Sequence, residues 1–510
     1  MTDTPKKLSL PAKPRSSASK KSSHKPARPN SRPPSGERSS YARRPKAPKP
    51  PMNPRPAPPV MADARLDLHS IIAAPADVLP PSGLAYQLTM AAHAAHAVVE
   101  GYSLQQALAV LPIDDVARAN VQRLSFDAMR HLGLVQFWVQ RAVDKPPVPW
   151  LQAMLWVALT QLHLREEDEF TLVNQAVAAV EARKPHAKGL VNAILRRFLR
   201  ERDEWLAAAS DDLVAHWNYP LWWIEKLQAQ HPNDWRQILA VGNAHPPMTL
   251  RVNARATDVA AYQALLSEHG RAASPMPALS PNALVLELPC AVSQLPEFGA
   301  GAVSVQDAGA QLSVELLDLQ NGMRVLDACA APGGKTCHIL ERFDVDLLAL
   351  EKDAPRSWRI EENFERLNLK ADIEVMDANV VKKWWDGVPF DRVLLDAPCS
   401  ASGIVRRHPD IRWLRESADT EGLARQQKQL LRSMWQVLAV GGRLLYCTCS
   451  VFEDEGEAVI SEFMGHTPNA SRVELPQMRE LTRTAGQLLP RMNENANHDG
   501  FFYAALIKTA

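Results

Sequence analysis

The sequence predicts an α/β protein in which an all-helical region precedes an open, mostly parallel sheet. From residue 303 onward, apolar runs of strand length alternate with amphipathic stretches, as in a parallel sheet covered by helices on both faces. Before it, residues 80–212 show the apolar spacing of helices, for example over 85–100 and 150–165. We therefore expect a helical domain at 80–212 and a sheet domain at 303–510.

The N-terminal stretch 1–75 differs in composition from the rest of the 510-residue chain. Its first 60 residues contain 15 Lys and Arg, only two acids, and 15 of the 40 prolines. Such a segment buries too little apolar surface to form a core, so we expect a disordered arm. Its charge suits sequence-independent contacts with nucleic-acid phosphates, and a solubilising tail explains the composition equally well.

Composition also excludes several classes of protein. No apolar run reaches the roughly 18 residues of a membrane span, and the basic N-terminus lacks the apolar core of a signal peptide. The six cysteines form no Cys-x-x-Cys pair, so we expect no metal site. A disulfide framework is not needed in a chain of this size. We expect a cytoplasmic monomer.

The last helix predicted in the helical domain has an apolar face and a basic one. The apolar face consists of Leu190, Val191, Ile194, Leu195 and Phe198. Arg196 and Arg197 occupy other positions, and on charge alone a solvated face and an RNA-binding face are equally good interpretations. Residues 188–197, Lys-Gly-Leu-Val-Asn-Ala-Ile-Leu-Arg-Arg, resemble the NusB-type RNA-binding domain. That resemblance favours RNA contact by Arg196 and Arg197.

Residues 218–302 mix helices with short strands. The pattern predicts a strand over 249–253 and a helix over 258–269. We expect a small α/β subdomain that leads into the main sheet.

The sheet domain opens with a loop suited to a nucleotide-like cofactor. A predicted strand ends at Asp327 and leads into Cys329, Ala330, Ala331, Pro332, Gly333, Gly334 and Lys335. The two glycines carry no Cβ, so the backbone can approach a ligand closely. The tail Gly334-Lys335-Thr336 imitates a phosphate-binding P-loop, but that motif requires glycine at position 329, where this chain has cysteine. The pattern therefore favours a Rossmann-like cofactor site over an NTPase.

Acidic residues follow the next predicted strands. Glu351 comes 24 residues after Asp327, close to the spacing at which an acid binds a ribose diol. Asp377 is placed to accept a hydrogen bond from an adenine amino group, and Asp396 ends a further strand. One such acid is more often a turn or cap residue, but a series in strand order indicates one cofactor cleft.

Two cysteines also follow apolar runs that predict buried strands. Cys399 comes after the run 392–395, and Cys449 after the run 443–446. In an open α/β sheet the carboxyl ends of strands form the ligand crevice, so both thiols should reach it. A single such cysteine is more often a small buried hydrophobe. Two of them beside a cofactor loop indicate covalent chemistry.

Three motifs together resemble one family. They are Asp327-Ala-Cys-Ala-Ala-Pro-Gly-Gly-Lys-Thr336, Asp396-Ala-Pro-Cys-Ser400 and Thr448-Cys-Ser450. They are similar to the motifs of S-adenosylmethionine-dependent RNA 5-methylcytosine methyltransferases, and the similarity extends over about 80–510. It is greatest to the branch that carries a NusB-like domain and acts on cytosine 967 of 16S ribosomal RNA.

The resemblance implies S-adenosyl-L-methionine as cofactor and 16S ribosomal RNA as partner. It places the cofactor on the loop 329–335 and on Glu351, Asp377 and Asp396. It also implies that Cys449 attacks the base and that Cys399 serves product release. The residues alone leave this order open, because Pro398-Cys399 looks like the nucleophile of DNA cytosine methyltransferases.

Further roles follow from the chemistry and position of single residues. Asp396 could hydrogen-bond the cytosine ring, for which its carboxyl would need a raised pKa that burial can supply. Lys335 would orient Asp396, and a lysine at a helix start is the alternative. In the loop 402–413, Arg406, Arg407 and His408 would contact RNA, because cations suit an unstacked base; a surface loop has the same composition, but the position beside Cys399 favours RNA contact.

The chain departs from the family pattern in its arm, at Glu351, where aspartate is usual, and at the additional Cys447. Two alternatives stand beside this reading. A non-catalytic RNA-binding protein would have lost the thiols or the cofactor loop, and both are intact. An enzyme that acts on transfer RNA or on another ribosomal cytosine is the stronger rival.

Overall fold

The computed structural model describes residues 68, 79–165, 168–479, 481, 486–493 and 496–510. Apart from Leu68, the predicted arm at 1–75 lies outside the described residues. All structure below belongs to one compact unit, Val60–Ala510. Within its described part, no helix is both long and apolar enough to cross a membrane.

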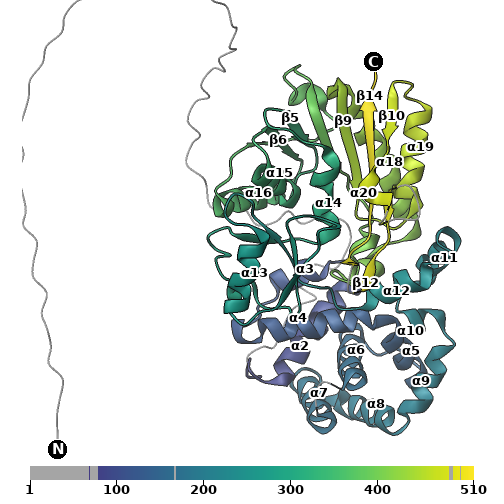
Figure 1. The fold of residues 1–510 in the computed structure, drawn as a ribbon. Helices are drawn as coiled ribbons and strands as arrows, with labels where there is room; N and C mark the ends of the chain where they lie inside the picture. The colour runs from purple at the N-terminus through teal and green to yellow at the C-terminus, as the bar shows by residue number, and fades with distance from the viewer. Residues whose placement is uncertain (1–67, 69–78, 166–167, 480, 482–485, 494–495) are drawn as a thin grey trace, which may run out of the picture. The chain divides into compact units, whose positions relative to one another are not determined.

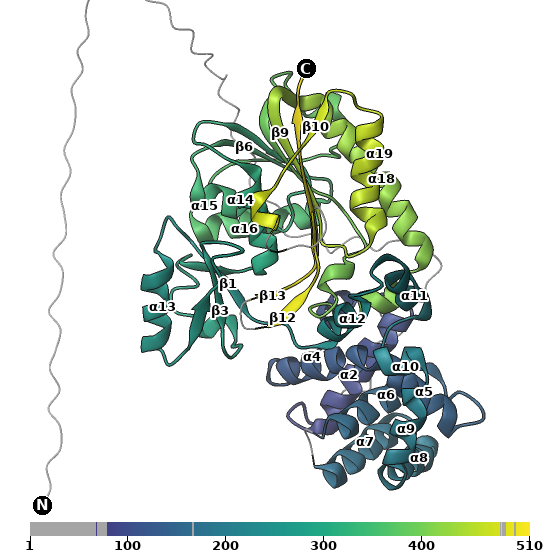
Figure 2. The same cartoon turned by 45° about the vertical axis from the view of Figure 1, so that its right-hand side comes forward.

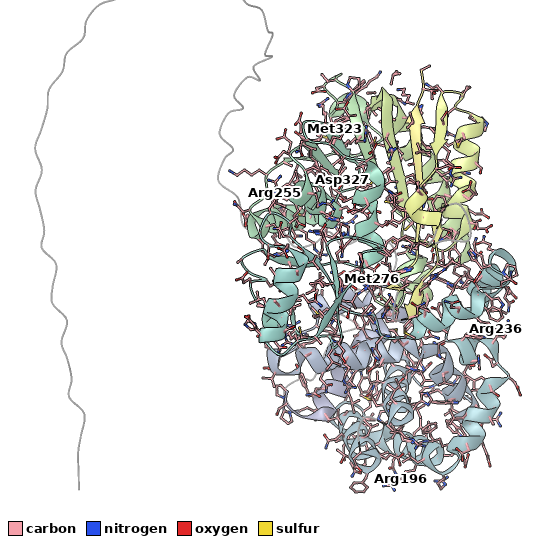
Figure 3. The ribbon with its side chains drawn as sticks, viewed as in Figure 1. Arg196, Arg236, Arg255, Met276, Met323 and Asp327 are labelled. Atoms are coloured by element: carbon pink, nitrogen blue, oxygen red, sulfur yellow. The ribbon has the colours of Figure 1, made fainter. Side chains whose placement is uncertain are left out.

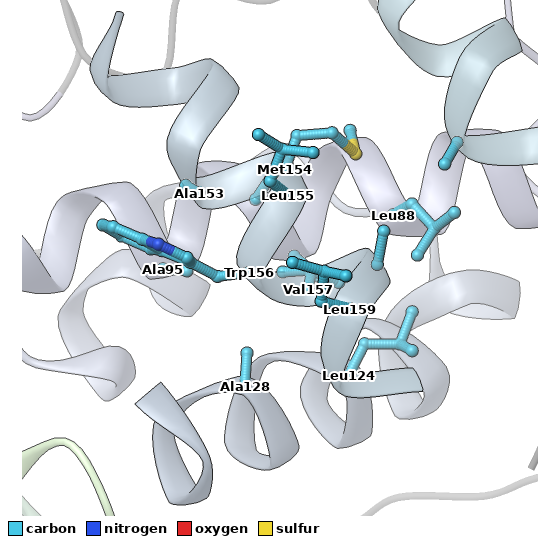
Figure 4. Packing of buried hydrophobic residues seen from close by; sticks show 14 of the residues in the cluster. Leu88, Ala95, Leu124, Ala128, Ala153, Met154, Leu155, Trp156, Val157 and Leu159 are labelled. Carbon is cyan, nitrogen blue, oxygen red and sulfur yellow. The ribbon is translucent and has the colours of Figure 1, made fainter. Parts of the chain in front are cut away.

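A bundle of helices forms the first part of this unit (Figure 1). Its members are α2 (Leu84–Val99), α3 (Leu104–Val110), α4 (Asp115–Arg130), α5 (Leu132–Ala142), α6 (Pro149–Leu164), α7 (Glu169–Arg183), α8 (Lys188–Arg200), α9 (Arg202–Ser210) and α10 (Leu213–Trp217). The alanine-rich α2 packs against α4, α6 and α7, and small side chains let these helices approach closely. Figure 4 shows this core, where Leu155 and Leu159 of α6 lie among Leu88 of α2 and Leu124 of α4.

Helix α8 differs in two ways from the sequence prediction. Val191, Ile194, Leu195 and Phe198 are buried, but Leu190 is 42% exposed. The buried positions follow the i, i+3, i+4, i+7 spacing of one helix face, and position 190 falls on its flank. The helix is also not the last of the bundle, because α9 and α10 follow it.

A small antiparallel sheet lies between the bundle and the main sheet in sequence. Its strand order is β2 (Ala273–Pro275), β3 (Ala283–Leu286), β1 (Thr249–Val252) and β4 (Val303–Val305). The predicted strand and helix at 249–269 correspond to β1 and α13 (Val259–Glu268), and the Asp258 side chain caps α13 by accepting from Ala261 N. Because β4 pairs with β1, this sheet continues past residue 302.

The main sheet is mostly parallel. Its order is β10 (Ala470–Val473), β14 (Phe501–Lys508), β9 (Leu438–Thr448), β8 (Phe390–Asp396), β5 (Arg324–Asp327), β6 (Asp346–Glu351) and β7 (Asp372–Val375). Only β14 runs against its neighbours β9 and β10. The short strand β11 (Gln487–Leu488) pairs antiparallel with the start of β14.

Helices cover both faces of this sheet (Figure 2). One apolar cluster joins a first face to α14 (Ala308–Leu317), α15 (Gly334–Arg342) and α16 (Ala354–Leu367). A second cluster joins the other face to α18 (Ser417–Val437) and α19 (Glu457–Gly465). The predicted α/β class is therefore confirmed.

Buried ion pairs fasten the loop that follows β8 to distant parts of the chain. Arg406 binds Asp499, while Arg407 binds Asp499 at 2.5 Å and Asp307 at 2.9 Å. Asp307 comes just after β4, and Asp499 just before β14. The Arg130 side chain of α4 in turn donates to the Arg406 carbonyl oxygen at 3.1 Å. One loop thus connects the helical bundle, the small sheet and the last strand.

The same loop makes further contacts with the helical parts. The Asp410 carboxylate accepts from the backbone N–H of Leu104, the first residue of α3, at 2.9 Å. The Trp413 indole donates to the Met129 carbonyl at 2.8 Å. These bonds fix the backbone of a segment that begins directly after Cys399.

Arg406→Ala should destabilise the protein strongly, because it leaves two carboxylates in a buried site short of a cation. Removal of one partner of a buried ion pair costs about 3–5 kcal/mol. Urea denaturation followed by tryptophan fluorescence should show the loss as a lower midpoint. Arg425→Ala is the control, because Arg425 is 73% exposed and its ion pair should contribute little. Equal midpoints for the two variants would contradict a structural role of Arg406.

Candidate active site

The carboxyl ends of the parallel strands bring the predicted site residues to one edge of the sheet. Strand β5 ends at Asp327, β6 at Glu351 and β8 at Asp396. Cys449 follows directly after β9, where Cys447 pairs in register with Asp396. Because these strands are parallel, residues far apart in sequence become neighbours.

The loop after β5 is shaped by one glycine and one buried acid. Gly333 has φ +97°, and a Cβ there would lie 3.2 Å from the Ile360 Cα, so the position requires glycine. Thr336 Oγ1 donates to Asp327 Oδ2 at 2.7 Å. Burial raises the pKa of Asp327 to about 7. Its Oδ1 atom is buried and has no hydrogen-bond partner among the described residues.

A solvent-open pocket of about 370 Å³ lies beside this loop. Three of the predicted cofactor residues, Cys329, Glu351 and Asp377, line it. The other lining residues include the apolar Met376, Ala378, Pro398 and Leu430 and the polar Lys352, Arg356, Asn379 and Gln426, which the sequence analysis did not single out. Apolar walls between polar ends suit a ligand that has both a flat ring and hydroxyl or amino groups.

Glu351 also shapes the loop itself. Its carboxylate accepts from the backbone N–H of Asp353 at 3.0 Å and of Ala331 at 3.3 Å. Arg356 lies 3.6 Å from the same carboxylate and donates to the Ala331 carbonyl at 3.0 Å. Asp377 is exposed, and its Oδ1 atom accepts from Asn379 N at 2.8 Å. Of the other predicted loop residues, Ala330, Ala331 and Pro332 form the turn that leads through Gly333 into α15.

The two predicted thiols are in contact. The Sγ atoms of Cys399 and Cys449 are 3.4 Å apart, and both side chains are half-buried. The hydrogen bond to Cys449, together with burial, raises the pKa of Cys399 well above its ordinary value. The raised pKa keeps the Cys399 thiol protonated, and either sulfur can be the donor in the contact between the two cysteines. The backbone N–H of Gly403 donates to the Cys449 carbonyl at 2.9 Å, which ties the two cysteine loops together.

Lys335 and Cys447 hold Asp396 from two sides. Lys335 Nζ lies 2.6 Å from Asp396 Oδ2, and Cys447 Sγ donates to Oδ1 at 3.4 Å. Burial opposes the charge on Lys335, but Asp396 and the nearby thiols raise the pKa of this amine, so it stays cationic. Cys447 is fully buried, and burial and Asp396 raise the pKa of its thiol. Cys447 is thus a neutral partner of Asp396, while Cys399 and Cys449 are the more accessible pair.

Glu455 belongs to the site although the sequence analysis did not single it out. Its side chain is fully buried and accepts hydrogen bonds from Ser400 and Ser450, the residues that follow the two cysteines. In sequence it ends the acidic run Glu453-Asp454-Glu455, which is typical of an exposed turn. Only its short distance from Cys449 could have indicated a role.

The predicted RNA-contacting residues fall into two groups. Arg406 and Arg407 need correction, because their guanidinium groups are bound to Asp307 and Asp499, and Arg406 is 1% exposed. His408, Arg196 and Arg197 have exposed side chains. Figure 3 labels Arg196 at the surface of the helical bundle and Asp327 in the main sheet.

Three family models match consecutive parts of the chain. The NusB family matches 84–200, a ferredoxin-like domain of RsmF/B-like methyltransferases matches 219–293, and the 16S rRNA methyltransferase RsmB/F family matches 314–507. The matches follow the helical bundle, the small antiparallel sheet and the main sheet in order.

Similar whole proteins carry related names. The chain is 43% identical over 404 residues to the ribosomal RNA small subunit methyltransferase B of Pseudomonas putida, a match that covers 78% of this chain and 92% of the relative. It is 39% identical over 426 residues to the protein of the same name from Vibrio cholerae, covering 82% and 96%. The crystal structure of PH0851 has a TM-score of 0.69 at 24% identity and covers 84% of this chain and 99% of its own, which shows a shared fold.

Proposed function

Because this chain belongs to the 16S rRNA methyltransferase RsmB/F family and uses S-adenosyl-L-methionine to methylate ribosomal RNA, we propose that it methylates carbon 5 of a cytosine through a covalent cysteine intermediate. The observation that carries this proposal is the pair of half-buried thiols, Cys399 and Cys449, 3.4 Å apart at the edge that also holds the cofactor pocket. Methylation of an exocyclic nitrogen or a ribose hydroxyl would require neither thiol.

Carbon 5 of cytosine is a weak nucleophile, and addition of a thiolate at carbon 6 makes it enamine-like. The cofactor, when bound, supplies an electrophilic methyl group. We assign the attack to Cys449, as the resemblance of Thr448-Cys-Ser450 to the RNA methyltransferase motif implies, and the protonated Cys399, 3.4 Å away, can donate to the Cys449 sulfur. Cys399 then serves product release, when the carbon 5 proton leaves and the bond from carbon 6 to Cys449 breaks.

Asp396 is the group we assign to the cytosine ring. Asp396 is the last residue of β8, just before the loop that carries Cys399. Its bonds to Lys335 and Cys447 leave its carboxylate little rotational freedom. Lys335 and Cys447 are therefore positioning residues in this proposal. Cys447, which departs from the family pattern, would give Asp396 a second hydrogen-bonding partner and would not act as a third reactive thiol.

The pocket residues fit S-adenosyl-L-methionine. Glu351 offers a buried carboxylate for a ribose diol, and Asp377 offers an exposed carboxylate for an amino group beside the apolar walls. The loop from Cys329 to Lys335 would face the rest of the cofactor, and burial keeps the Cys329 thiol neutral by raising its pKa. The longer Glu351 side chain, in place of aspartate, is accommodated by its bonds to Ala331 N and Asp353 N.

For RNA contact we propose the exposed Arg196 and Arg197 of α8 and the exposed His408 of the loop 402–413. Arg197 lies over the Trp205 ring and forms a partly exposed ion pair with Glu201, which a phosphate can replace at little cost. We further propose cytosine 967 of 16S ribosomal RNA as the target base.

Bisulfite sequencing of ribosomal and transfer RNA from a strain that lacks this gene tests the target. Bisulfite converts cytosine but not 5-methylcytosine, so one 16S position should change from protected to converted. The wild-type gene should restore protection, and a Cys449→Ala gene should not. Full protection throughout 16S RNA in the deletion strain, with a newly converted transfer-RNA position, would contradict the proposed substrate.

The two cysteines should fail differently when replaced. Cys449→Ala should abolish methylation and give no protein–RNA adduct, because no thiolate attacks carbon 6. Cys399→Ala should still attack and methylate, so an adduct that survives denaturing gel electrophoresis should accumulate. Cys447→Ala should retain most activity, because Lys335 still holds Asp396 and no reactive thiol is lost. An adduct in Cys449→Ala and none in Cys399→Ala would transfer the nucleophile to position 399.

Asp377→Ala should weaken cofactor binding, because a polar group of the ligand loses its partner. The expected loss is about 1–3 kcal/mol, measured by isothermal titration calorimetry with S-adenosylmethionine. Asp386→Ala is the control, since Asp386 is an equally exposed acid that pairs with Arg324 at the opposite end of β5. Unchanged affinity in Asp377→Ala would remove this residue from the cofactor site.

A further inference from the structure

The Glu455 carboxylate is a buried anion held by neutral donors. It accepts from the Ser400 backbone N–H at 2.7 Å, from the Ser400 hydroxyl, from the Ser450 hydroxyl at 2.6 Å and from the Gln427 amide at 3.2 Å. The side chain is fully buried, and among the described residues no cation forms an ion pair with it. A buried carboxylate is tolerated only when such bonds replace its hydration, so these donors and Glu455 constrain one another.

The donors come from two different strand ends. Ser400 directly follows Cys399 after β8, and Ser450 directly follows Cys449 after β9. A third hydroxyl, that of Ser402, lies 2.9 Å from the Ser450 hydroxyl and accepts from Val451 N at the same distance. The carboxylate thus spans the gap between the loops that carry the two thiols.

Glu455 is itself fixed to the sheet. It ends the short turn η5 (Glu453–Glu455), and its carbonyl oxygen accepts from the Tyr446 hydroxyl at 2.8 Å and the Thr448 hydroxyl at 3.3 Å. Both of those residues belong to β9. The Glu455 carboxylate is therefore fixed relative to β9, and its bonds to Ser400 fix the loop after β8 relative to the same strand.

We propose that Glu455 is a positioning residue that holds the Cys399 and Cys449 loops at one separation, so that both thiols reach the same cytosine. The inference rests on the proposed use of both thiols in one reaction. A glutamine at 455 would fill the same space, but it has one acceptor oxygen instead of two and carries no charge. The variant would therefore lose some of the hydrogen bonds from Ser400, Ser450 and Gln427 without leaving a cavity.

The charge of Glu455 has a second, measurable consequence. The hydrogen bond to Cys449 and burial are the main causes that raise the pKa of Cys399, and the nearby Glu455 carboxylate adds to them. Loss of this charge should lower the pKa of Cys399, and loosened loops should separate the two sulfur atoms. The first change makes the thiol more reactive, whereas the second makes the pair harder to join.

The first test measures the separation of the sulfurs without RNA or cofactor. Diamide takes up the two thiol protons and two electrons as Cys399 and Cys449 form a disulfide, and mass spectrometry of the linked peptides gives the rate. We expect Glu455→Gln to slow this rate several-fold. Glu453→Gln removes an exposed charge from the same turn and should leave the rate unchanged. Ser450→Ala, which keeps Glu455 in place, should show a smaller decrease if the amide variant proves unstable.

The second test measures the acidity of Cys399. In a Cys449→Ala background, iodoacetamide labelling of the Cys399 peptide as a function of pH gives the midpoint of thiol ionisation. Adding Glu455→Gln should lower that midpoint, with labelling below it faster by about threefold or more. Adding Glu453→Gln should not.

Diamide and labelling rates that match those of Glu453→Gln would overturn the proposal, since they would show that Glu455 neither sets the separation nor affects the thiol. Neither assay requires methyl transfer. Slower disulfide formation in Glu455→Gln would therefore support positioning even if the cysteine variants showed that the reaction proceeds without an adduct. In that case the proposed function would fail, and only the part of the inference that assigns the distance between the two thiols to Glu455 would stand.

Discussion

Arg406 and Arg407 share the buried carboxylates of Asp307 and Asp499, and the remaining architecture depends on this cluster. Burial and the closeness of Asp499 raise the pKa of Asp307, and removing the arginines would leave two buried carboxylates without their cations. Because the arginines sit in the loop after Cys399, the same ion pairs that join separate parts of the chain also fix one wall of the active site.

The sequence was sufficient to predict the main strands and to predict that the residues at their carboxyl ends lie at one edge of the sheet. Asp327, Glu351, Asp396 and the two cysteines each end a strongly apolar run, and parallel pairing leaves only one edge where such ends can meet. The contact between Cys399 and Cys449 follows from the neighbouring positions of β8 and β9 in the sheet. The placement of these residues at one edge follows from local patterns together with one topological rule, and their roles in a reaction stay predictions.

Predictions that depended on burial fared less well. A pair of arginines beside a reactive cysteine has the composition of an RNA-binding loop, and nothing local reveals that Asp307 and Asp499 approach from 92 or more residues away. Glu455 was missed for the opposite reason: an acid in an acidic turn is normally solvated, and nothing local reveals that this one is buried. Leu190 was assigned to a face by its type, although its position on the helix flank leaves it exposed. For the arginines and for Glu455, the missing information is which groups from distant parts of the sequence lie beside them in the fold.

Three acids near the thiols illustrate how environment, rather than residue type, sets chemical role. Asp327 is buried with one hydroxyl partner, and its pKa rises to about 7. Asp396 is held by the Lys335 ammonium group and the Cys447 thiol, one contact on each carboxylate oxygen. Glu455 is surrounded by hydroxyl and amide donors that can rearrange only together with the cysteine loops. An anion fixed in this way disfavours a second negative charge on the nearby Cys399. The network that we propose to set the distance between the thiols therefore also helps to keep Cys399 protonated, in keeping with the proposed assignment of Cys449 as the nucleophile.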